Sequence, residues 1–181
     1  MTVPQPPGST EDLFSTLYRE LHTLAERQLH RQGRGMTLGT TTLLHELYLN
    51  LADRTRIQFP DRARFLGYAS RAMRGLIVDY ARRRKATKRG GEFHLVSLEP
   101  DHAPVGSDAR GELDDLSEAI DQLSTVDADL AELVDLHFFC GLSFVEIAAL
   151  RGVSDRTVQR DWQKARLVLH RELSNEGPQA G

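Results

Sequence analysis

The chain contains a single cysteine, Cys140, so an intramolecular disulfide and a cysteine-rich zinc site are both excluded. A reducing compartment is the simplest setting, and we expect a cytoplasmic protein. The sequence has no apolar run that approaches the length of a membrane span, so we expect no membrane partner. Its start lacks the basic and apolar stretches of a secretory signal. The prolines and glycine there predict a disordered tail over residues 1–10.

Signals of catalysis and of metal binding are also scarce. The seven histidines are scattered along the chain. His45 and Glu46 begin like a zinc-protease motif, but Leu49 stands where the second histidine is needed. The glycines at 33, 35 and 39 follow a helical pattern rather than a strand, so they do not form a dinucleotide fingerprint. We therefore expect no catalytic residue, no metal, no cofactor and no enzymatic activity.

The net charge of −3 is small for a nucleic-acid binder, but it hides a strong segregation of charge. Residues 62–89 carry ten basic side chains and one acidic one, a net of +9. Residues 90–135 carry one basic and 13 acidic side chains, a net of −12. A strongly basic block beside a strongly acidic one indicates that the two have separate roles.

Apolar residues recur with helical spacing over most of the chain and predict an all-α fold. In the first half the pattern predicts helices over residues 11–32, 41–53 and 61–85. In the second half it predicts helices over about 112–123, 127–139, 144–151 and 155–173. We expect two helical domains, residues 11–91 and 113–174. The prolines, glycines and acids of residues 92–112 predict a flexible linker, and residues 175–181 a tail.

The run from Leu142 to Leu169 has the features of a helix-turn-helix. Ser143 and Glu146 form a capping box, Gly152 permits the turn, and Ser154 caps the second helix. Val153 is expected to fill the gap between the two helices. The second helix then turns long polar side chains outward, where they can reach base edges and phosphates in a major groove: Arg156, Thr157, Gln159, Arg160, Gln163 and Lys164. The alternative is an ordinary helical hairpin with a polar surface.

Aromatic residues are interleaved with the basic ones in the +9 block. Phe65, Tyr68 and Tyr80 lie among ten lysines and arginines on or just after one predicted helix. Such a surface suits a nucleic-acid backbone whose bases can stack on nearby rings. A solvated helix end explains residues 82–89 equally well when they are considered alone. The helix-turn-helix in the same chain favours DNA contact.

Three segments together resemble the extracytoplasmic-function (ECF) group of RNA polymerase sigma factors. They are LLHELYLNL, FLGYASRAMRGLIVDYARRRKATKRGG and GLSFVEIAALRGVSDRTVQRDWQKARLVLHREL, and their order and spacing also match. Residues 11–91 resemble sigma domain 2, and residues 113–174 resemble sigma domain 4. The resemblance implies a transcription initiation factor with two partners, promoter DNA and the RNA polymerase core.

The resemblance also implies roles for individual residues. The residues implied to dock on the clamp coiled coil of the polymerase are Leu43, Leu44, His45, Glu46 and Tyr48. Melting and capture of the −10 element fall to Arg71, Arg74, Tyr80, Arg82, Arg83 and Arg84. Reading of the −35 element falls to Arg156, Thr157, Gln159, Arg160 and Lys164. The second domain should also touch the polymerase flap.

One departure from the family pattern concerns the docking helix. Most members have an acidic run just before it, whereas this chain reads Gly39, Thr40, Thr41, Thr42. It resembles a minor subgroup in which Ser/Thr phosphorylation is thought to supply the missing charge. Each phosphate adds a charge of about −1.5 to −2. We hypothesise that a Ser/Thr protein kinase modifies Thr41 or a neighbour. The alternative is that the threonines only cap the helix.

Two further questions are left open by the sequence. A stand-alone helix-turn-helix regulator is the competing function, although a sensor domain has no reason to carry a +9 block. The acidic linker and its neighbours are also expected to screen the basic surface in the free protein, so that DNA binding waits for polymerase to separate the domains. The sequence does not say whether an anti-sigma factor exists.

Overall fold

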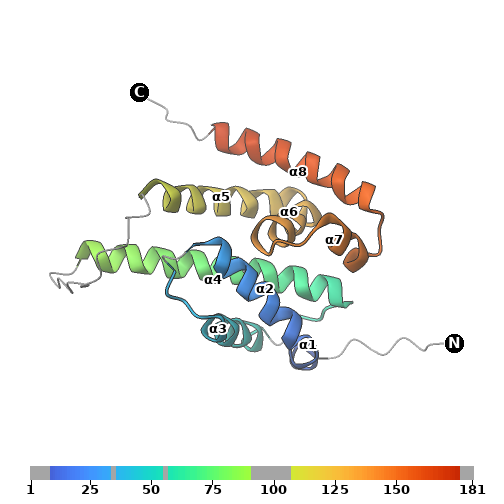
Figure 1. Cartoon of the computed structure of the whole chain (residues 1–181), viewed down its shortest axis with the longest axis horizontal. Coiled ribbons are helices and arrows are strands. Elements are labelled where there is room, and N and C mark those ends of the chain that lie inside the picture. The colour runs from blue at the N-terminus through green and yellow to red at the C-terminus, as the bar shows by residue number, and fades with distance from the viewer. Residues whose placement is uncertain (1–8, 34–35, 55–56, 91–106, 176–181) are drawn as a thin grey trace.

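The computed structural model describes residues 9–33, 36–54, 57–90 and 107–175, and the regular structure in these ranges is entirely helical. The all-α prediction is therefore confirmed. Figure 1 shows two layers: α1 to α4 form an N-terminal bundle, and α5 to α8 form a C-terminal bundle above it. The predicted tails, apart from their residues 9–10 and 175, lie outside the described residues, as do residues 92–106 of the predicted linker.

The N-terminal bundle consists of α1 (Thr10–Thr16), α2 (Tyr18–Arg31), α3 (Thr40–Ala52) and α4 (Arg62–Gly90). The single helix predicted over 11–32 is interrupted at Leu17, whose backbone leaves the helical region at φ −100° and ψ 16°. The side chain of Leu17 is buried, so it anchors the bend in the core. That core also contains the leucines of α2 and α3 and the apolar stripe of α4: Leu21, Leu43, Leu47, Phe65, Met73 and Ile77.

The C-terminal bundle consists of α5 (Ser107–Val126), α6 (Ala128–Val134), α7 (Phe144–Arg151) and α8 (Asp155–Asn175). Helix α5 begins inside the segment predicted as linker, so residues 107–112 are helical. The helix predicted over 127–139 changes to a π-helix, η1 (Asp135–Phe139). A wider helical turn of this kind is rare and is enriched at functional sites.

The two bundles pack directly against each other along α4. Helix α4 lies against α5, α6 and η1, and the long helices α4 and α5 run side by side in Figure 1. Gly67 of α4 faces Glu132 of α6 so closely that a Cβ atom at position 67 would overlap the glutamate side chain. Cys140, just after η1, is buried with the core of the N-terminal bundle. We call this contact between the bundles the seam.

Among the helices that the structure describes, none is long and apolar enough to cross a membrane.

Candidate nucleic-acid interface

The helix-turn-helix forms as its local sequence predicts. Ser143 accepts from the backbone N–H of Glu146 at 3.1 Å, and the Glu146 carboxylate accepts from the backbone N–H of Ser143 at 2.7 Å. This pairing with a backbone donor lowers the pKa of Glu146. Gly152 adopts φ 66°, a left-handed conformation that glycine adopts without a Cβ clash. The expectation that Val153 fills the gap between the two helices is wrong, because this residue is 43% exposed.

An aromatic cluster fixes the angle between the two helices of this motif. The His137 ring stacks on Phe144 at 4.4 Å between ring centroids and meets Trp162 edge-on at 4.6 Å. One ring nitrogen of His137 lies 2.7 Å from the carbonyl oxygen of Leu142. Sequence reasoning missed His137, because its contact with Phe144 depends on the turn after η1, where Gly141 has a positive φ. Val158 is buried beneath the cluster.

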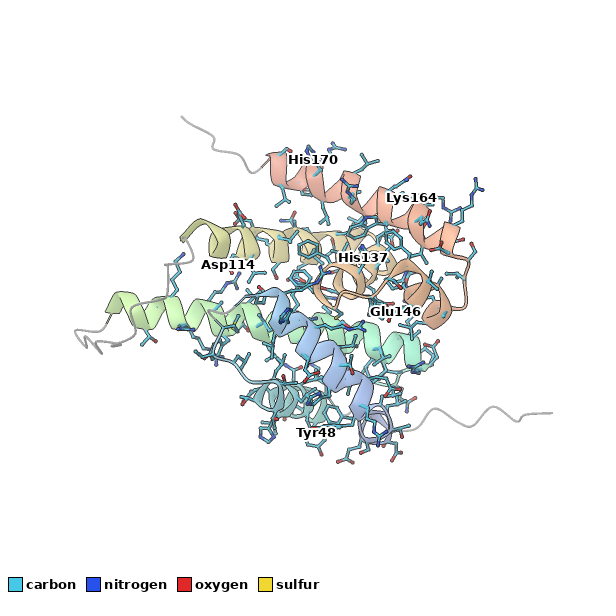
Figure 2. All side chains as sticks on the ribbon, viewed as in Figure 1. Tyr48, Asp114, His137, Glu146, Lys164 and His170 are labelled. Atoms are coloured by element: carbon cyan, nitrogen blue, oxygen red, sulfur yellow. The ribbon has the colours of Figure 1, made fainter. Side chains whose placement is uncertain are left out.

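The outer face of α8 carries the side chains predicted to read DNA. Arg156, Gln159, Arg160 and Lys164 are exposed. Figure 2 shows Lys164 on α8, in the layer remote from α4. Thr157 differs, because its hydroxyl lies 2.9 Å from that of Ser154 and belongs to the helix cap. Gln159 donates to Asp155, while Arg160 and Lys164 share Asp161 at 3.5 Å and 3.9 Å.

The basic face of α4 meets carboxylates of α5. Arg82 Nε donates to an oxygen of Asp114 over 2.9 Å. Arg71 lies 3.6 Å from Asp121, between the guanidinium nitrogen and the carboxylate oxygen. Figure 2 shows Asp114 on α5 in the layer directly above α4. Arg83 is exposed on the same helix.

Arg74 occupies the centre of the seam, and its side chain is only 2% exposed. Its Nε donates to Asp135 at 2.6 Å, and one terminal nitrogen donates to Asp121 at 3.0 Å. The other terminal nitrogen donates to the Ser117 hydroxyl and to the Ser117 carbonyl. The guanidinium carbon also lies 5.8 Å from the centre of the Phe139 ring. Arg74 therefore has no access to DNA in this arrangement.

The far end of the basic face is connected to the segment before α3. The Tyr80 hydroxyl lies 2.6 Å from the hydroxyl of Thr37, and Arg84 donates to the same oxygen at 3.5 Å. Both side chains are half-buried. Of the six residues predicted to bind the −10 element, only Arg71, Arg82 and Arg83 are exposed.

Helix α3 exposes only part of the set of residues predicted to dock on polymerase. Leu43 and Leu44 lie in the core, at 0% and 2% exposure, so they hold the helix in place and face no partner. His45 and Glu46 are exposed, and Tyr48 is half-buried and donates to Glu11 at 2.8 Å. This contact raises the pKa of Tyr48. Leu49, at 45% exposure, was missed by the sequence, although it lies one turn after His45 and Glu46.

The threonines at the start of α3 do not cap it. The N-cap residue is Gly39, and no side chain caps this helix. Its first turn carries no acidic residue, so the positive end of the helix dipole has no negative partner there. Thr41 and Thr42 are exposed, whereas Thr40 is half-buried and lines a hollow that also contains Arg27, His30 and Arg31.

A model of the ECF sigma factor family matches residues 7–175, which span both bundles. The chain belongs to the ECF sigma factor family. Among curated proteins, none matches this chain significantly. As an alternative sigma factor it directs transcription initiation, with RNA polymerase core and promoter DNA as its partners. Within the described ranges, no group of three potential ligands could hold a metal ion.

Proposed function

We propose that this ECF sigma factor reads promoters with two separate surfaces, the outer face of α8 for the −35 element and the basic face of α4 for the −10 element. In this proposal, residues 11–91 act as sigma domain 2 and residues 113–174 as sigma domain 4. Exposed arginine, glutamine and lysine side chains on α8 support the first assignment. Such donors, on a helix fixed by a capped turn, suit base edges and phosphates in the major groove.

The second part of the proposal is that phosphorylation near Thr41 enables docking on polymerase. The observation that carries it is the start of α3, which has neither a side-chain cap nor an acidic residue in its first turn. The alternative was that the threonines only cap the helix, and none of their side chains makes a capping hydrogen bond. A phosphate there adds a charge of about −1.5 to −2 at the positive end of the helix dipole. A Ser/Thr protein kinase is the partner that this site requires.

Exposure separates the three candidate threonines. Thr41 and Thr42 face solvent, so a kinase can reach them and their phosphates can face a partner. Thr40 is half-buried and lines a hollow with Glu26, Arg27 and Arg31, so its phosphate would face charges of this chain. A phosphate on Thr40 is therefore less available to a partner than one on Thr41. The charge that polymerase needs is best supplied by Thr41, with Thr42 as the second choice.

The test is binding of RNA polymerase core to full-length protein carrying phosphothreonine at position 41. We expect tighter core binding than with the unmodified chain, and loss of induced promoter activity in Thr41→Ala. The control is the same modification at Thr125, which is exposed on α5 of the other bundle. Equal binding by the modified and unmodified proteins contradicts the switch. A similar gain from position 125 contradicts a specific site on α3.

A further inference from the structure

The arginines at the seam lie on one stripe of α4. Arg71, Arg74 and Arg82 are three and eight residues apart, so they share one side of a helix with 3.6 residues per turn. Ser117 and Asp121 are three and seven residues after Asp114, so these residues share one side of α5. The two stripes face each other. Arg82 meets Asp114 at one end, and Arg71 meets Asp121 at the other.

The groups that α5 presents to this stripe are chemically similar to those of a nucleic-acid backbone. The Asp114 and Asp121 carboxylates accept charge-assisted hydrogen bonds from arginine, as phosphate oxygens do. The Ser117 hydroxyl and carbonyl add two neutral acceptors for Arg74. Helix α5 thus supplies an acceptor for every arginine of the stripe.

A hollow of about 330 Å³ opens beside the same contacts. Its charged and aromatic lining comes from three elements: Tyr68, Arg71, Arg74 and Asp79 of α4, Arg54 near the end of α3, and Asp121 of α5. A tyrosine that lines the same hollow as arginines is suited to stacking a base whose phosphate is held nearby. Asp121 lines this hollow and pairs there with Arg71 and Arg74, the groups that would otherwise be available to a phosphate.

We propose that helix α5 occupies the nucleic-acid surface of α4 in the free protein, with Asp114, Ser117 and Asp121 in place of backbone phosphates. This inference rests on the proposed role of α4 in binding the −10 element. Single-stranded DNA and α5 then compete for the same arginines, and the closed seam keeps α4 of the free sigma factor from holding a strand. Contact with polymerase core must shift α5 before α4 can hold a melted strand.

The acidic helix offers a matched control for this competition. Asp115 and Glu118 are exposed on α5, between and beside the paired residues. Asp114→Asn/Asp121→Asn and Asp115→Asn/Glu118→Gln remove the same amount of charge from the same helix. The first removes the two carboxylates that pair with arginines of α4, and the second removes only carboxylates that make no such pair. Both leave the buried pair of Arg74 and Asp135 in place, which favours a folded chain.

The probe is a fluorescein-labelled random-sequence 20-nucleotide single strand, titrated with full-length protein at several salt concentrations. We expect Asp114→Asn/Asp121→Asn to bind about fivefold more tightly than the control, as expected for releasing Arg71 and Arg82 from partly exposed ion pairs. The third pair that is lost, Arg74 with Asp121, leaves Arg74 held by Asp135 and Ser117. The freed Arg71 and Arg82 should also steepen the dependence of log affinity on log salt by about 1.4, which is roughly 0.7 for each added phosphate contact.

Arg83→Ala separates this inference from the proposed function. Arg83 is exposed on α4, so its loss should weaken binding of the strand in every background if α4 is the DNA surface. Equal affinity and salt dependence in the two double variants overturn the competition, even where Arg83→Ala weakens binding. If Arg83→Ala also has no effect, the role of α4 in DNA binding is overturned as well.

Discussion

Arg74 donates from Nε to a carboxylate oxygen of Asp135 over 2.6 Å, and both side chains are shielded from solvent. This ion pair joins α4 to η1 across the seam. The second carboxylate oxygen of Asp135, Oδ2, has no hydrogen-bond partner. In a buried ion pair, the free energy of lost hydration offsets much of the attraction between the charges. Either charge is therefore strongly destabilising when its partner is removed.

Removing one member of this pair should therefore cost more than removing both. We expect Arg74→Met to lower the free energy of unfolding by about 3–5 kcal/mol, because Asp135 is left as an uncompensated buried charge. The double variant Arg74→Met/Asp135→Leu should recover a large part of that loss. Urea unfolding of Arg74→Met, of Asp135→Leu and of the double variant measures the coupling energy between the two side chains. Additive losses would show that the two side chains act independently.

The pH dependence of stability should reveal the cost of burying Asp135. Burial raises the pKa of Asp135 to about 6 from an ordinary value of 3.8, and Arg74 only partly opposes this shift. The folded chain thus holds this proton more tightly than the unfolded chain, so stability rises as the pH falls from above 6 toward 4. The full difference is about 3 kcal/mol, at roughly 1.36 kcal/mol for each pKa unit.

Asp135→Asn isolates that contribution, because the other titrating groups are present in both proteins. We expect the difference in unfolding free energy, wild type minus variant, to increase as the pH is lowered from 7.5 to 5. Glu132, whose pKa burial also raises, should cancel in this difference. A difference that is constant over this pH range would contradict a raised pKa at Asp135.

Two glycines of α4 provide a test of how tightly the seam is packed. A Cβ at Gly67 overlaps Glu132, which pairs with Arg151 at 3.1 Å, whereas a Cβ at Gly75 meets nothing within 4 Å. Gly75→Ala should stabilise the helix by up to about 1 kcal/mol. Gly67→Ala should lose at least that benefit, because Glu132 must move and its ion pair weakens. Thermal unfolding of the two variants compares them, and equal gains would show a loose seam.

The reading face of α8 can be tested with two arginines of the same helix. Arg156 belongs to the predicted −35 reader, and Arg166 is also exposed but lies outside it. Arg156→Ala should weaken binding of full-length protein to duplex DNA and reduce the salt slope by about 0.9. Arg166→Ala should change both quantities less. The same loss from both variants would indicate binding through overall charge rather than through the predicted face.

Local sequence signals predicted the elements whose cause is local. Ser143 with Glu146 and the turn at Gly152 were correctly placed, since caps and left-handed turns depend on a few neighbouring residues. The burial of Leu43 and Leu44 follows from the apolar periodicity of α3 itself, yet the family resemblance assigned them to docking.

Features that depend on distant residues were not predictable in this way. The burial of Arg74 requires Ser117, Asp121 and Asp135, which lie 43 to 61 residues further along the chain. No periodicity within α4 shows that an arginine will be buried there. The break at Leu17 and the π-helix at Asp135 are likewise set by packing against other helices. The expected screening of the basic block stays a prediction, and at the seam carboxylates of α5 lie against Arg71, Arg74 and Arg82.

Cys140 lies at the seam, where the Gln28 amide donates to its sulfur over 3.2 Å and the sulfur donates to Ser70 over 3.4 Å. It is the only thiol in the chain, it is fully buried, and burial raises its pKa to about 11. A thiol reagent can react with it only after an opening that exposes it, and separation of the bundles is one such opening. The rate of modification of Cys140 therefore reports how often the unlabelled wild-type protein opens. This rate can be compared in the presence and absence of polymerase.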